Sequence, residues 1–259
     1  MDIIRTMCEP EEEIHSLLVL ASASPRRKSL LALLGIPFAV QPAGVQEVNH
    51  DGEGPADMAA RLSATKARAV GAAVPGRVVI AADTLVYVDG KVLGKPADED
   101  EAIEMLRRLR GRPHVVFSGV TLIDGRAEWQ RTEVAATTVR MRRYSDGEIA
   151  AYVSSGDPLD KAGAYAIQYR DFRPVECVEG CYANVMGLPL CHLYNLLCAA
   201  GASPGATPVA ACNRFNARVC DVADTILTSA RESRDRSRGK GPSLQRGVGG
   251  VGGPVEERR

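Results

Sequence analysis

The chain has 259 residues with 45% hydrophobic content, which is enough to bury a full core in one domain or two. Lysine and arginine together number 32, as do aspartate and glutamate, so the even balance excludes a global attraction to nucleic acid or to a membrane surface. No apolar run approaches the roughly 20 residues that span a bilayer, and the acids from Glu9 to Glu13 have the wrong charge for a signal peptide, so we expect a cytoplasmic protein without a membrane partner.

The N-terminal part of the chain alternates apolar runs with helix signals. Leu17 to Ala21 reads as a buried strand. Ser24-Pro25 fits the N-cap and first position of a helix that ends at Gly35. The serine hydroxyl can accept a hydrogen bond from an unpaired backbone N–H of the first turn, and proline has no N–H to leave unpaired. A second helix is predicted from about Pro55 to Val70. Its inward residues are Met58, Leu62, Ala69 and Val70.

The segment VIAADTLVYVDGKVLGKP, from Val79 to Pro96, is predicted to bring polar side chains to the end of one buried strand. Its opening apolar run reads as a strand buried on both faces that ends at Asp83 and Thr84. A turn at Asp89-Gly90 and the cation Lys95 follow. An aspartate at that position is better placed for chemistry than for solubility, although aspartates at strand ends also hydrogen-bond turns.

A helix, a hairpin and two further helices complete the expected fold. The helix begins at Asp98, with acids in its first turn, and the strands His114 to Ile123 and Glu128 to Met141 join at Asp124-Gly125. Ser145 with Glu148 is a capping-box pattern that opens the next helix, and Pro189 to Ala200 reads as the last core helix. Strands that alternate with helices indicate an α/β fold with a mixed sheet.

The character of the chain changes beyond Gly201. Residues 202–230 hold one candidate amphipathic helix, Thr207 to Ala230, and residues 231–259, rich in Arg, Ser and Gly, are expected to be disordered. The main domain is then 17–201, after an N-terminal extension of 1–16. The arginines of the tail could touch nucleic acid, but a solvated tail is the better account of them.

The seven cysteines are odd in number, and most occur in apolar segments, as expected of reduced thiols used as small core residues. Those in apolar segments are Cys191, Cys198, Cys212 and Cys220. Cys177 and Cys181 are four residues apart, but no second pair follows at zinc-site spacing, so we do not expect a zinc site there.

Cations gather at two places where a fold alone does not require them. Ser22, Ser24, Arg26 and Arg27 crowd a strand-to-helix turn, where the helix N-terminus attracts anions and arginines offer paired donors shaped for phosphate. Lys66 lies on the second helix. For both places a solvated face is the alternative.

Carboxylates and an amide complete the polar set. Asp160, Lys161 and Gln168 lie in a loop punctuated by glycine and proline, and the amide of Gln168 suits the edge of a base. Glu47, before the polar stretch Asn49 to Gly54, is a further carboxylate whose use the residues alone leave open. Cations for phosphates, carboxylates for a divalent metal and a water, and an amide for a base together indicate a nucleotide polyphosphate as substrate.

Five ordered motifs carry this chemistry between roughly Leu17 and Ala200. They are S-x-S-P-R-R at Ser22 to Arg27, A-A-D-T at Ala81 to Thr84, G-K-P at Gly94 to Pro96, P-L-D-K-A-G-A-Y-x-I-Q at Pro158 to Gln168, and G-L-P-L at Gly187 to Leu190. Together they resemble the Maf family of nucleoside triphosphate pyrophosphatases. The resemblance implies a mixed twisted sheet with flanking helices and two lobes around a cleft, as in the inosine triphosphate pyrophosphatases. It also implies hydrolysis of a nucleoside triphosphate to monophosphate and pyrophosphate with Mg²⁺ or Mn²⁺, one purpose being the clearance of non-standard nucleotides.

The resemblance also assigns roles to residues. Arg27, Thr84 and Gln168 match the subgroup that acts on dTTP and UTP. Asp83 becomes the proton acceptor or a metal-bound carboxylate, with Glu47 as a second metal ligand. The remaining substrate-binding residues are Ser22, Arg26, Lys66, Lys95 and Lys161. The expected partner is a small-molecule nucleotide rather than a nucleic acid, and a homodimer stays open.

Two positions depart from the family pattern. Gln46-Glu47 stands where the family often has two acids, and Tyr169 to Pro174 replaces the usual glycine-rich loop after Gln168, which we expect to reshape the base pocket. A different class of function is the alternative, namely a nucleotide-binding regulator of cell division without significant turnover. Retention of Asp83 argues against it, because a pure binding module gains nothing from a carboxylate beside polyphosphate unless a cation bridges them.

Overall fold

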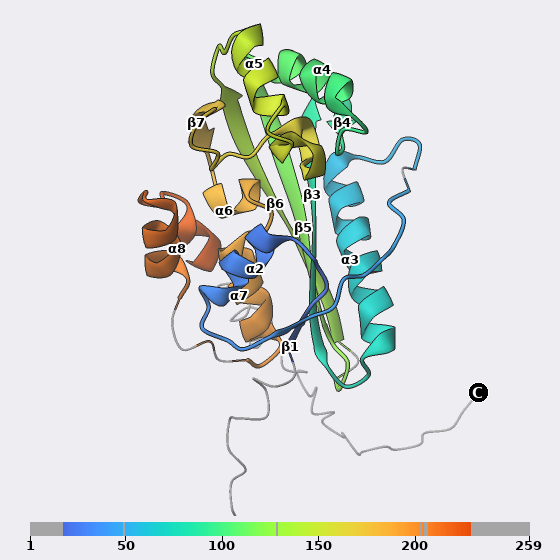
Figure 1. The fold of residues 1–259 in the computed structure, drawn as a ribbon. Helices are drawn as coiled ribbons and strands as arrows, with labels where there is room; N and C mark the ends of the chain where they lie inside the picture. The colour runs from blue at the N-terminus through green and yellow to red at the C-terminus, as the bar shows by residue number, and fades with distance from the viewer. Residues whose placement is uncertain (1–17, 49, 128, 203, 205–206, 229–259) are drawn as a thin grey trace, which may run out of the picture.

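The computed structural model describes residues 18–48, 50–127, 129–202, 204 and 207–228. The predicted extension 1–16 and tail 231–259 lie outside these described residues. Within them, a seven-stranded sheet has the order β2-β1-β3-β5-β6-β7, and β4 also pairs with β3 (Figure 1). The strands are β1 (Leu18–Leu20), β2 (Ala39–Val40), β3 (Val78–Val88), β4 (Lys91–Leu93), β5 (Pro113–Asp124), β6 (Trp129–Met141) and β7 (Val175–Glu179).

The sheet is mixed, as predicted. Strand β1 runs parallel to β2 and β3, whereas the β3–β4, β3–β5, β5–β6 and β6–β7 pairs are antiparallel. The helices are α2 (Pro25–Ala32), α3 (Pro55–Ala73), α4 (Glu99–Leu109), α5 (Asp146–Val153), α6 (Tyr182–Val185), α7 (Leu190–Ala199) and α8 (Val209–Asn216), with two 3₁₀ turns, η1 (Asp157–Asp160) and η2 (Ala162–Ala164).

Local sequence signals explain why several of these helices begin where they do. The Ser24 hydroxyl caps α2 by accepting from the N–H of Arg27, Asp98 caps α4, and Ser145 with Glu148 forms the complete capping box of α5. Gly35, just after α2, has a φ of +68°, which glycine adopts without strain.

Two hydrophobic clusters occupy opposite ends of the long strands and give the molecule two lobes. One packs α2 and α7 against β1 and the first half of β3, and includes Leu30, Ile80 and Leu193. The other packs α4 and α5 against the far ends of β3 and β6, and includes Leu106 and Met141. Helix α3 lies along the sheet beside β3 and β5, as Figure 1 shows.

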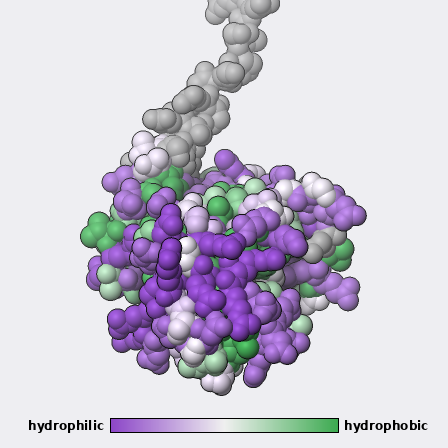
Figure 2. Space-filling model, turned by 90° about the horizontal axis from the view of Figure 1, so that it is seen from above, coloured by the Kyte–Doolittle hydropathy of each residue, from purple (hydrophilic) through white to green (hydrophobic). Residues whose placement is uncertain are grey.

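The outer surface at the α4 and α5 end is mostly hydrophilic, with hydrophobic residues showing only in scattered groups (Figure 2). Helix α4 contributes acids in its first turn and two arginines, Arg107 and Arg108, in its last, an order that matches the helix dipole. None of the helices in the described part of the chain is long and apolar enough to cross a membrane.

Three sequence predictions about the elements were wrong. Asp83 does not end a strand but lies in the middle of β3, because the antiparallel partner β5 extends that strand to Val88. Ala69 is exposed on α3, since the helix presents Ala67 and Val70 to the sheet instead. The helix predicted from 207 to 230 breaks after α8, where Ala217 takes a left-handed φ of +51°, and helical residues resume only at 223–228.

Helix α3 approaches the sheet closely at one glycine. Gly119 of β5 is the register partner of Asp83, and a Cβ added to Gly119 would overlap the backbone carbonyl of Ala59 on α3. The Ser63 hydroxyl lies 2.8 Å from that of Thr121 and ties the same helix to β5. Gly119 therefore sets how near α3 can lie to β3.

We predict that Gly119→Ala lowers the free energy of unfolding by roughly 1–3 kcal/mol, because backbone rather than a flexible side chain must move. Gly71→Ala on α3 is the matched control, since its added Cβ would meet only Ile123 Cδ1, at 3.9 Å. That control should gain up to about 1 kcal/mol from helix propensity. Urea unfolding measures both, and a Gly119→Ala variant as stable as the parent would contradict the close approach.

Candidate active site

A cavity of about 430 Å³ lies where one edge of β3 has no neighbouring strand. Strand β1 pairs with Val78 to Ile80 and β4 pairs with Val86 to Val88, so the residues between them, including Asp83 and Thr84, face an opening in the sheet. The cavity is lined by the start of α2, the 43–47 loop, α3, β3, and the segments 160–168 and 185–187.

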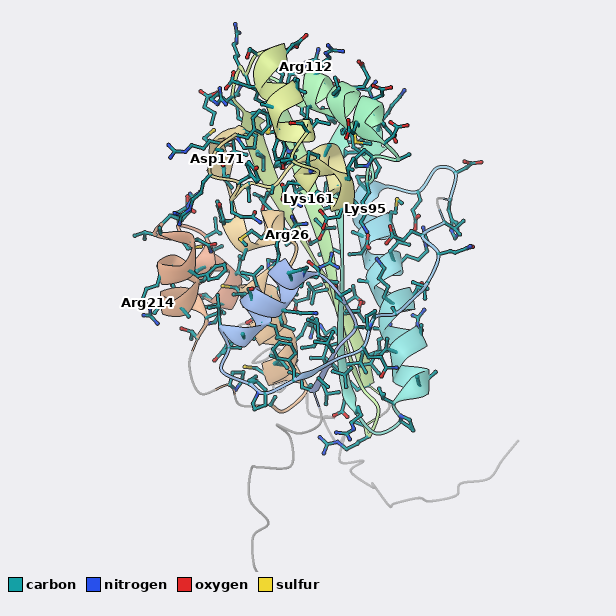
Figure 3. The ribbon with its side chains drawn as sticks, viewed as in Figure 1. Arg26, Lys95, Arg112, Lys161, Asp171 and Arg214 are labelled. Atoms are coloured by element: carbon teal, nitrogen blue, oxygen red, sulfur yellow. The ribbon has the colours of Figure 1, made fainter. Side chains whose placement is uncertain are left out.

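All ten residues predicted for the site line this one cavity. They are Ser22, Arg26, Arg27, Glu47, Lys66, Asp83, Thr84, Lys95, Lys161 and Gln168. Figure 3 shows Arg26, Lys95 and Lys161 gathered between α2 and the 3₁₀ turns, whereas Arg112 and Arg214 lie toward the outside of the molecule. The structure thus brings together residues from across the chain, and their individual roles remain predictions.

Asp83 and Glu47 both accept hydrogen bonds from Lys66, which lies on α3. Asp83 is 3% exposed, and its Oδ1 accepts a hydrogen bond from Lys66 Nζ. The same ammonium donates to Glu47 Oε1 at 2.6 Å. Burial alone would raise the pKa of Glu47, but the hydrogen bond and charge of Lys66, with Lys95 and Arg27 nearby, hold that pKa below its ordinary value.

One oxygen of this centre has no hydrogen-bond partner. Asp83 Oδ2 is buried and unpaired among the described residues. A buried carboxylate oxygen without a hydrogen-bond donor is rare in folded proteins, because no hydrogen bond compensates the free energy of its desolvation. Asp83 lines the cavity, so this oxygen lacks only a donor or a cation that a bound ligand could bring.

Arg27 is held by three uncharged oxygens. Its Nε donates to the Gly187 carbonyl at 2.9 Å, Nη1 to Ser22 Oγ at 3.2 Å, and Nη2 to Thr84 Oγ1 at 3.1 Å. Burial lowers the pKa of Arg27, opposed by the charge of Asp83 and reinforced by that of Arg26. A guanidinium placed in this way is rigid and electrically uncompensated by its direct partners.

The structure gives Thr84 a task that sequence reasoning missed. Residues alternate in direction along a strand, so Thr84 extends to the side opposite Asp83 and contacts Arg27. Its hydroxyl also lies 2.8 Å from that of Ser118, which donates to the Asn184 carbonyl at 3.2 Å. Thr84 thus contacts the arginine rather than standing free in the cavity.

Ser118, Asn184 and Gly187 were not predicted as site residues. Asn184 is fully buried and donates to the Val116 carbonyl at 3.0 Å and to Thr137 Oγ1 at 2.9 Å, so it joins α6 to two strands. These contacts join residues more than 40 positions apart, so no local sequence pattern predicts them. Gly187 belongs to the G-L-P-L motif, but that motif did not predict that its carbonyl accepts a hydrogen bond from Arg27.

Lys161 and Gln168 belong to the part of the cavity lining formed by residues 160–168. Lys161 is 7% exposed, and its Nζ donates to the Asp157 carbonyl and to Asp160 Oδ1, each at 2.5 Å, and lies 3.0 Å from Asp157 Oδ1. Gln168 is exposed at the rim of the cavity. The lysine is thus fixed by acids of the preceding 3₁₀ turn, η1, whereas the amide is open to a ligand.

The donors present suit a hard divalent cation better than zinc. Mg²⁺ is commonly bound by one or two carboxylates together with phosphate oxygens and waters. Asp83, with its unpaired Oδ2, and half-exposed Glu47 provide two such carboxylates. In the described ranges no group of three or more His, Cys, Asp or Glu side chains is arranged to hold a metal ion, so phosphate oxygens would have to complete the coordination.

Comparisons with known proteins show the family to which the chain belongs. The family described as Maf-like protein matches residues 17–200. A protein of Thermomicrobium roseum named dTTP/UTP pyrophosphatase is 46% identical over 84% of this chain and 99% of its own length. One of Koribacter versatilis with the same name is 48% identical over 71% of this chain and 94% of its own length. The solved structure of the Staphylococcus aureus Ham1 protein has a TM-score of 0.35 and 16% identity, and covers 48% of this chain and 71% of its own.

We predict that Thr84→Val weakens the binding of nucleoside triphosphates by on the order of tenfold, whatever their base, because valine keeps the shape but removes the oxygen that accepts from Arg27. Thr84→Ser keeps that oxygen and serves as the control, with affinity near that of the parent. Calorimetric titration with a purine and a pyrimidine nucleotide checks both. A loss confined to the pyrimidine would show instead that Thr84 reads the base.

Proposed function

We propose a reaction for this chain, which belongs to the Maf family: it hydrolyses a nucleoside triphosphate to the nucleoside monophosphate and pyrophosphate, with dTTP and UTP as the preferred substrates. The names of the relatives support the substrates. The observation that carries the reaction is the buried carboxylate of Asp83, which has one oxygen without a hydrogen-bond partner and lines a cavity together with five cations. These cations are Arg26, Arg27, Lys66, Lys95 and Lys161.

The cations bind and orient the triphosphate. Water attacks the α-phosphorus while pyrophosphate leaves, and most of the barrier lies in placing the anionic substrate and neutralising charge as it moves. Arg27 is preorganised for this by its three neutral acceptors, and Lys161 by its own acids. The long side chains of Arg26 and Lys95 can follow the phosphates as they separate.

Asp83 is the residue that activates the attacking water. Its Oδ1 is engaged by Lys66, so Oδ2 is the atom that can accept a proton from water or bind a cation. General-base assistance of this kind contributes about 10²–10⁴-fold. A divalent cation, Mg²⁺ or Mn²⁺, held by Asp83 and Glu47 would neutralise phosphate charge and make the water more acidic.

Gln168 is the group we propose for the base. It lies at the rim of the cavity, and a carboxamide can donate to a pyrimidine carbonyl while accepting from N3–H. Thr84 is better explained as support for Arg27. A cytoplasmic location and a homodimer stay predictions from the sequence.

We predict that the purified protein with Mg²⁺ or Mn²⁺ releases pyrophosphate, and no orthophosphate, from dTTP or UTP. The reason is that the cations surround a whole triphosphate and leave the α-phosphorus for attack beside Asp83. Coupled assays for the two products, with a panel of nucleoside triphosphates, make the measurement. Release of orthophosphate alone would mean attack at the γ-phosphorus and would refute the assignment.

We predict that Asp83→Asn lowers kcat by about 10²-fold or more while nucleotide still binds, because asparagine keeps the shape but cannot take a proton. Asp89→Asn, on the exposed β3–β4 turn, is the matched control and should keep the parent kcat. Steady-state kinetics and titration with nucleotide separate turnover from binding. A parent protein that binds nucleotide without turnover would favour a regulator of cell division.

A further inference from the structure

We infer that Tyr152 on α5 is a positioning residue, whose single hydroxyl fixes both Lys161 and the 166–168 wall of the cavity. This inference rests on the proposed function, since it concerns how the same cavity holds phosphate and base. Tyr152 is 2% exposed and does not line the cavity, so it acts through residues that do. No motif in the sequence pointed to it.

The hydroxyl uses its donor and an acceptor position at once. It donates to Asp157 Oδ2 at 2.6 Å, because an ionised carboxylate can only accept. It also accepts from the backbone N–H of Ala166 at 3.0 Å. Burial raises the pKa of Tyr152, and the hydrogen bond to Asp157 raises it further, so the hydroxyl keeps its proton for that bond.

Asp157 passes this constraint to the lysine. Its Oδ2 accepts the hydrogen bond of the tyrosine hydroxyl, while its Oδ1 lies 3.0 Å from Lys161 Nζ. A carboxylate shared between two donors attracts each less strongly than one devoted to a single cation. The tyrosine therefore moderates the hold of Asp157 on Lys161 and leaves more of the ammonium for phosphate.

The ring of Tyr152 fixes the other side of the wall. It stacks on Phe172 with ring centroids 4.5 Å apart and tilts against Tyr169 at 4.7 Å. The Tyr169 N–H donates to the Ala166 carbonyl at 3.1 Å, so both polar groups of Ala166 are held from this aromatic cluster. Residues 169–174 thus support the wall from behind, since the lining of the cavity among described residues stops at Gln168 in this segment.

Tyr144 provides a matched control within the same cluster. It is equally buried at 2%, its ring tilts against Phe172 at 4.8 Å, and its hydroxyl donates to the Leu106 carbonyl at 2.8 Å. Its hydroxyl thus contacts α4 and no residue of the cavity. Removing the Tyr152 hydroxyl takes an acceptor from the Ala166 N–H, whereas the Leu106 carbonyl keeps its hydrogen bond from the Arg110 N–H. We therefore expect Tyr144→Phe to lose less stability than Tyr152→Phe.

The test compares Tyr152→Phe with Tyr144→Phe by kcat and KM for dTTP hydrolysis, by the dissociation constant of pyrophosphate, and by Tm. We expect Tyr152→Phe to raise KM and the pyrophosphate dissociation constant by about tenfold with a smaller change in kcat, as for one lost polar contact. Tyr144→Phe should stay within about twofold in both, with a smaller fall in Tm than Tyr152→Phe.

Asp157→Asn gives an independent route to the same contact if Tyr152→Phe folds poorly. It removes an acid that competes with phosphate for Lys161, so the pyrophosphate dissociation constant should fall below that of the parent. Binding constants of Tyr152→Phe or Asp157→Asn that match those of Tyr144→Phe would overturn the inference. Failure of the proposed function has a different result, because then the parent protein itself would release no pyrophosphate.

Discussion

The buried ion pair between Asp83 and Lys66 is the interaction on which the site depends. A carboxylate in the middle of a central strand is costly unless it is paired, and removing one partner of such a pair typically costs about 3–5 kcal/mol. The lysine comes from α3, and it can reach Asp83 only because Gly119 lets that helix approach the sheet. The fold and the site are therefore coupled through a missing Cβ on the neighbouring strand.

Alternation along β3 then divides the chemistry between two sides of the sheet. Asp83 meets α3, whereas Thr84 meets the arginine of α2. A continuous sheet would keep these sides apart. Strand β1 ends at Leu20, however, and β4 begins its pairing only at Val86, so both side chains border one opening. An unpaired stretch of strand, which is usually a liability, is here the entrance to the cavity.

Local signals predicted much of the fold, and the failures have a common cause. The caps at Ser24, Asp98 and Ser145 mark helix starts through contacts within four residues, and all three are present. The length of β3 depends on β5, so the sequence around Asp83 could not reveal that the strand continues. Strand β7 was missed because its five residues are half-exposed and follow no clear alternation.

The same distinction applies to the site. Motifs contained eight of the ten residues now found around one cavity, and Glu47 and Lys66 lay outside them. No motif marked the partners that orient these residues. Ser118 and Tyr152 themselves lie outside every motif. They act through hydrogen bonds to Thr84 and Ala166, which are distant in sequence, so only the packed structure identifies them.

The cations of the cavity differ in what neutralises them, and this difference suggests how substrate is held. Lys66 and Lys161 each pair with two acids, so phosphate must compete with carboxylates already in place. Arg27 has only uncharged acceptors, and burial disfavours its charge. A phosphate beside Arg27 would relieve that penalty, whereas one beside a paired lysine would first have to displace an acid. Because a desolvated cation without a counter-ion gains most from an incoming anion, we propose Arg27 as the main anchor for the triphosphate in this cavity.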